Sequence, residues 1–99
     1  MLKIVGTESC EASMGIDSLL VTVEGDNIDE VLSSGAKQVA YDERKNHGLH
    51  GAGISAAGGP FPIDVKTGNA VASSEMAEIS KRLSDIKYRI TFKLTQGMD

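Results

Sequence analysis

The sequence predicts a two-layer α+β domain in which two helices pack on one face of an antiparallel or mixed β-sheet. Two segments, Ile16 to Glu24 and Tyr88 to Thr95, alternate apolar and polar residues, which is typical of strands with one buried and one solvated face. Between them, Ile28 to Ala40 repeats apolar residues at helical spacing. The 99 residues, 1–99, are expected to form a single domain.

The first third of the chain predicts two strands. Leu2 to Val5 is expected to be a short strand, and Gly6 to Gly15, which is rich in small and polar residues, is expected to be a loop. The strand from Ile16 to Glu24 places Leu19, Val21 and Val23 on its buried face.

The first helix has the clearest boundaries and period. Asn27 is a favourable N-cap, and Glu30 follows it at the capping-box spacing. Its apolar face is predicted to consist of Ile28, Val31, Leu32, Gly35, Ala36, Val39 and Ala40.

A glycine-rich segment follows and is predicted to be a long loop over residues 46–62. It holds both histidines and both prolines, and long loops in small domains are often functional. We expect residues 47–59 to be the least ordered internal segment, and we expect folding to tolerate shortening of Gly51–Gly59. The predicted partner-binding residues in this loop are His47, His50, Gly51, Gly53, Ser55, Gly58 and Gly59.

The last third predicts a small hairpin or extended arm around Gly68, a second helix from Ser73 or Ser74 to about Asp85, and the strand from Tyr88 to Thr95. The alternation along this strand buries one face and leaves a basic, solvated one. The predicted core consists of Val21, Val23, Val31, Leu32, Val39, Ile79, Leu83, Ile90 and Phe92.

Composition is that of an ordinary globular protein, with 40% apolar and 24% charged residues. There is no membrane-length apolar run and no signal peptide, and Cys10 is the single cysteine, so a cytoplasmic location is expected. A small core without Trp favours homodimerisation as an added source of stability.

Charge is unevenly distributed along a chain of net charge −4. Asp17 to Glu30 carries five acidic residues and no basic one. Basic residues gather near the C-terminus, and the predicted basic surface consists of Lys81, Arg82, Lys87, Arg89 and Lys93.

No motif predicts a cofactor, a metal or a catalytic residue. Gly51 to Ala56 matches a dinucleotide-binding pattern, but that pattern needs a strand before it and a helix after it. His47 and His50, with Asp42 and Glu43 nearby, are interpreted as solvated residues because Gly48 and Gly51 disfavour the helix that would align them. Cys10 has Glu8 and Glu11 as neighbours, which weaken it as a nucleophile.

The sequence therefore favours a small interaction protein that binds another protein, with the glycine-rich loop ordering on its partner. Its composition is similar to that of small phage or mobile-element proteins that inhibit a host enzyme. One alternative is a nucleic-acid-binding module that uses the basic surface. Another is a small enzyme or ligand-binding protein with the histidines and glycines around its site.

Overall fold

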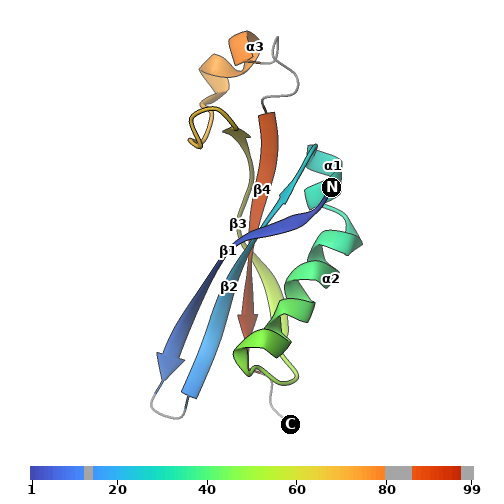
Figure 1. Ribbon diagram of the computed structural model, residues 1–99, viewed down its shortest axis with the longest axis vertical. Coiled ribbons are helices and arrows are strands. Elements are labelled where there is room, and N and C mark those ends of the chain that lie inside the picture. The colour runs from blue at the N-terminus through green and yellow to red at the C-terminus, as the bar shows by residue number, and fades with distance from the viewer. Residues whose placement is uncertain (13–14, 80–85, 97–99) are drawn as a thin grey trace.

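The computed structural model describes residues 1–12, 15–79 and 86–96, and shows a four-stranded antiparallel sheet with helices on one face (Figure 1). The strands are β1 (Lys3–Ala12), β2 (Gly15–Gly25), β3 (Gly53–Asp64) and β4 (Ile86–Thr95), in the order β1-β2-β4-β3. Every neighbouring pair is antiparallel. The predicted α+β class is confirmed.

The predicted first helix is two helices, α1 (Ile28–Val31) and α2 (Ser34–Asp42), followed by a 3₁₀ turn, η1 (Glu43–His47). Asn27 caps α1 as expected, since its Oδ1 accepts from the Glu30 N–H at 3.0 Å. Ser33 then begins a new helix, because its hydroxyl oxygen accepts from the Ala36 N–H at 3.3 Å. This restart shifts the helical face, and Leu32 is 58% exposed instead of buried.

The core lies between α1, α2 and the sheet. Alternate residues of β2 and β4 form its floor, and residues from the helices and from the connection after η1 cover it. Of the predicted core residues, Val39 is half-buried, Leu32 is exposed, and Leu83 lies outside the described residues. The buried cluster consists of Leu19, Val21, Val23, Val31, Ala36, Ala40, Leu49, Ala52, Ile90, Phe92 and Leu94.

The predicted loop over residues 46–62 is wrong for most of its length, because Gly53–Asp64 is strand β3 and pairs with β4. The pairing of β3 with β4 has two register shifts, between Ala56 and Gly58 and between Gly58 and Phe61. Small residues in this stretch allow the two backbones to stay close together. Gly59 has φ +88°, and a Cβ there would lie 2.7 Å from the Arg89 carbonyl oxygen, so glycine is required by contact with β4. Shortening this segment would remove part of a strand, so the structure gives a reason to expect that shortening would disturb folding.

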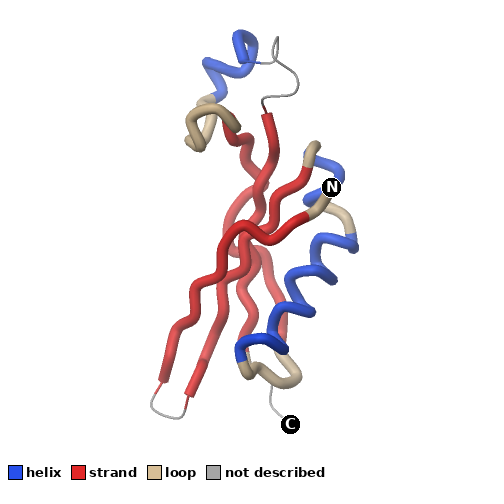
Figure 2. The backbone as a smooth tube through the Cα atoms, viewed as in Figure 1, coloured by secondary structure: helices blue, strands red, loops and turns tan. Residues whose placement is uncertain are grey.

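The predicted loop over residues 6–15 is also wrong, since β1 continues to Ala12 and forms a long hairpin with β2. Beyond Gly6 the strand is exposed on both faces, so it carries no apolar alternation. The pairing of β2 with β4 begins only at Ser18, and the hairpin extends past it (Figure 2). The molecule is consequently elongated, with a radius of gyration of 14.9 Å against about 13 Å for a compact domain of this size.

A small hairpin joins β3 to the remaining helical segment, as the sequence predicts. The Val71 N–H donates to the Pro62 carbonyl at 3.0 Å, and Gly68 sits in the turn at φ +74°. The chain continues through η2 (Ser73–Glu75) into α3 (Met76–Ile79). This segment lies at the far end of the sheet, away from α1 and α2 (Figure 1). The rest of the predicted second helix lies outside the described residues. No helix among the described residues has the length and apolarity to span a membrane.

Candidate functional site

The helices cover the sheet incompletely. Helices α1 and α2 pack on β2 and β4, and α2 also reaches β1, but neither packs substantially on β3. Ala56 of β3 stands opposite Phe92 of β4 in register, so both residues face the helix side. Phe92 is 3% exposed beneath the helices, whereas Ala56 is exposed. The uncovered part of β3 therefore leaves a gap in the helix layer.

This gap is a groove of about 360 Å³, here called the helix–strand groove. Its floor is the buried pair Ile90 and Phe92, and its walls come from the α1–α2 corner on one side and from β3 on the other. Leu32 stands on the helical wall with most of its side chain in water. The lining residues are Val31, Leu32, Ser33, Ser34, Lys37, Ala56, Ile90 and Phe92.

The strand beside the groove is an edge of the sheet, and its first half, Gly53 to Ala57, is here called the β3 edge segment. Edge strands are commonly protected from further pairing by charges, prolines or bulges. The other edge, β1, carries Lys3, Glu8 and Glu11, and the second half of β3 carries two prolines. The β3 edge segment carries neither charge nor proline, and its one register shift falls at its end, between Ala56 and Gly58, so Gly53 to Ala56 is the less protected stretch.

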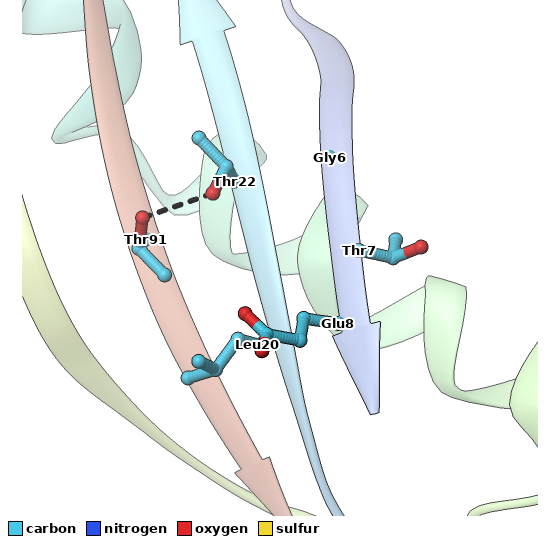
Figure 3. A pocket seen from close by; sticks show the side chains of 6 residues that line it. All are labelled: Gly6, Thr7, Glu8, Leu20, Thr22 and Thr91. Carbon is cyan, nitrogen blue, oxygen red and sulfur yellow. Dashed lines mark hydrogen bonds between the residues drawn. The ribbon is translucent and has the colours of Figure 1, made fainter. Parts of the chain in front are cut away.

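A second hollow, of about 310 Å³, lies on the face of the sheet opposite α1 and α2 (Figure 3). In register, Gly6 stands beside Thr22, and Thr22 beside Thr91, so the missing side chain at Gly6 opens the hollow. The Thr22 and Thr91 hydroxyls are 3.0 Å apart and bond to one another. The floor is thus polar and already paired. The lining residues are Gly6, Thr7, Glu8, Leu20, Thr22 and Thr91.

Two residues of the predicted basic surface form ion pairs with the acidic segment. Arg89 Nε lies 2.9 Å from Glu24 Oε2 across β2 and β4, and Lys87 pairs with Asp26. The Lys87 ammonium, together with the amino group of Met1, lowers the pKa of Asp26 to about 2. Asp26 in turn raises the pKa of Lys87.

Of the other three basic residues, only Lys93 is described, and it lies on the same face of β4 as Lys87 and Arg89. Lys93 is exposed on the open face of the sheet, beside Leu20 in register, while Lys81 and Arg82 lie outside the described residues. Within the described residues, part of the separation of charge along the chain is therefore an internal pairing of the two segments.

The two histidines lie apart from both hollows. His47 Nε2 is 3.3 Å from Glu43 Oε1 on η1, and His50 is exposed, with its backbone N–H donating to Gln96. Between them Leu49 is 2% exposed and anchors the connection in the core. Among the described residues, no group of three potential metal ligands gathers, and the segment that matches the dinucleotide pattern enters a strand instead of a helix.

The predicted partner-binding residues come from three consecutive segments of the chain. His47 belongs to η1, His50 and Gly51 to the connection, and the others to β3. Ser55 and Gly58 stand opposite Lys93 and Thr91 on the open face. Sequence reasoning missed the groove residues Leu32, Lys37 and Ala56. The Ser33-Ser34 pair, with its N-cap preference, was the signal that a new helix begins there and exposes Leu32.

The free cysteine, Cys10, is exposed on β1, in the part of the β1–β2 hairpin near its turn.

The chain matches no protein-family model, and no curated protein or solved structure is similar to it at a significant level.

Proposed function

We propose that this protein is a small protein-interaction module that binds an extended segment of a partner. The segment adds to the sheet along the β3 edge segment and inserts an apolar side chain into the helix–strand groove. One observation carries the proposal: the helix layer stops short of the least protected edge of the sheet and leaves an apolar floor beside it. Strand addition supplies affinity through backbone hydrogen bonds, and a flanking groove supplies side-chain specificity.

The proposal retains the role suggested by composition, that of a phage- or mobile-element-type modulator of a host enzyme. A module of 99 residues acts in this role by occupying a segment of the enzyme. We also propose a cytoplasmic location, which is supported by the single exposed thiol of Cys10, since a reducing compartment keeps such a group unpaired.

The test is selection of binders from a random library of displayed peptides, followed by affinity measurement on two matched variants. Ala56→Arg fills the groove from the strand side, whereas Ser55→Arg places the same side chain on the opposite face of the same strand. Both positions are exposed, so both variants should fold.

We expect the selected peptides to bind wild type and Ser55→Arg equally and to lose at least about tenfold in affinity on Ala56→Arg, because roughly 1.4 kcal/mol of anchor burial is removed. The proposal fails if no peptide is enriched over background, or if Ala56→Arg binds as well as wild type.

A further inference from the structure

The helix–strand groove has one charged residue in its lining, and that residue is a lysine. Lys37 lies in α2, one turn beyond Ser33, and shares the helical wall with Ser34 and Leu32. Its side chain is exposed and makes no ion pair with any described residue. A lysine in this position packs its apolar stem on the wall and keeps its ammonium group in water at the rim.

Two acidic residues of the β2–α1 region already have partners of their own. Glu24 pairs with Arg89 across the sheet, and Asp26 pairs with Lys87. Neither carboxylate is therefore available to neutralise Lys37 without giving up its own partner. Across the described parts of the chain, the positive charge at the groove rim therefore has no ion-pair partner.

The β3 edge segment contributes no charge, so it cannot select a partner by sign. Charge complementarity at an interface rim acts mainly on specificity and on the rate of encounter. In this groove, Lys37 is the lining residue that can select a partner by charge. We propose that the bound segment carries an acidic side chain, aspartate or glutamate, at a fixed spacing from its apolar anchor, and that Lys37 recognises it. This inference rests on the proposed function.

The effect of Lys37 is expected to be modest, because the ion pair is exposed. An exposed pair contributes up to about 1 kcal/mol, which corresponds to roughly a two- to fivefold change in affinity. Removing the charge with Lys37→Gln should weaken acidic peptides by that factor. The difference between the two proteins should shrink at high salt, because the interaction is screened.

The test repeats the peptide selection on wild type, Lys37→Glu and Lys45→Glu. Lys45 is an exposed lysine on η1, outside the groove lining, and its substitution changes net charge by the same amount. We expect wild type and Lys45→Glu to enrich Asp or Glu at one fixed distance from an apolar residue. We expect Lys37→Glu to enrich Lys or Arg at that same position.

The outcomes separate the two proposals. Enrichment of the same apolar residue without a charge preference, identical in Lys37→Glu, would overturn the role of Lys37 and leave groove binding intact. No enrichment on any protein would overturn both. Sedimentation of the free protein adds a further decisive result: a dimer that Ala56→Arg dissociates would show that a second copy of this chain occupies the groove, and would overturn both proposals.

Discussion

Replacing Leu49 with alanine should strongly destabilise the protein, although Leu49 lies in a glycine-rich connection. The side chain is 2% exposed and belongs to the central cluster with residues of β2 and β4. It fixes the chain between η1 and β3 to the core. The substitution therefore tests whether this connection is part of the folded core or a mere linker.

The expected loss follows from the atoms removed. Leucine to alanine deletes three carbon groups at about 0.8 kcal/mol each, or about 2.4 kcal/mol for transfer alone. The cavity left behind raises the range to about 2–5 kcal/mol. A domain of this size has about 5–15 kcal/mol of stability in total, so the variant should lose a large fraction of it.

The assay is urea unfolding followed by far-ultraviolet circular dichroism, which suits a chain without Trp. His50→Ala is the matched control, because His50 is exposed next to Leu49 and its bond to Gln96 uses the backbone N–H. The control should change stability by less than about 0.5 kcal/mol. A loss below about 1 kcal/mol for Leu49→Ala would refute the assignment of this connection to the core.

Four further substitutions test the cap, the close contact of β3 and the ion pair of Asp26. Ser33→Ala should cost about 1 kcal/mol in an unfolding titration, since the hydroxyl caps α2. Gly68→Ala should lower the free energy of unfolding by about 1–2 kcal/mol, because Gly68 has a positive φ. Gly59→Ala should lower it further in the same titration, because its Cβ would also meet a backbone oxygen. Equal losses for the two variants would contradict the contact between Gly59 and β4. The pKa of Asp26 is lowered from 3.8 to about 2, so its contribution is present above about pH 4 and lost as pH falls toward 2. Asp26→Asn should flatten the stability profile between those values, and an unchanged profile would exclude the ion pair.

Much of the fold could be predicted because several segments carry unambiguous local signals. Alternation identified the central strands, and Asn27 identified the start of α1. The two edge strands could not be predicted in the same way. β1 is solvated on both faces beyond Gly6, and β3 is built from small residues that fit the contour of β4, so neither shows a periodic apolar pattern.

The site was harder to predict for a related reason. The groove exists because α1 ends at the α1–α2 corner and because the helices stop short of β3, and both depend on tertiary packing. The sequence did draw attention to the segment that contains Ala56, although it assigned that segment to a loop. It offered no local sign that Lys37 would stand beside it.

The uncovered face of the sheet has a consequence for how the strands find their alignment. On the helix side, Leu19, Val21 and Val23 meet Leu94, Phe92 and Ile90, and a slip of two residues that brings Leu19 opposite Phe92 would still match aliphatic with apolar partners. On the open side the same slip would separate Thr22 from Thr91 and Glu24 from Arg89. The solvated residues thus distinguish the native alignment from its near copies, a discrimination that the buried residues cannot make.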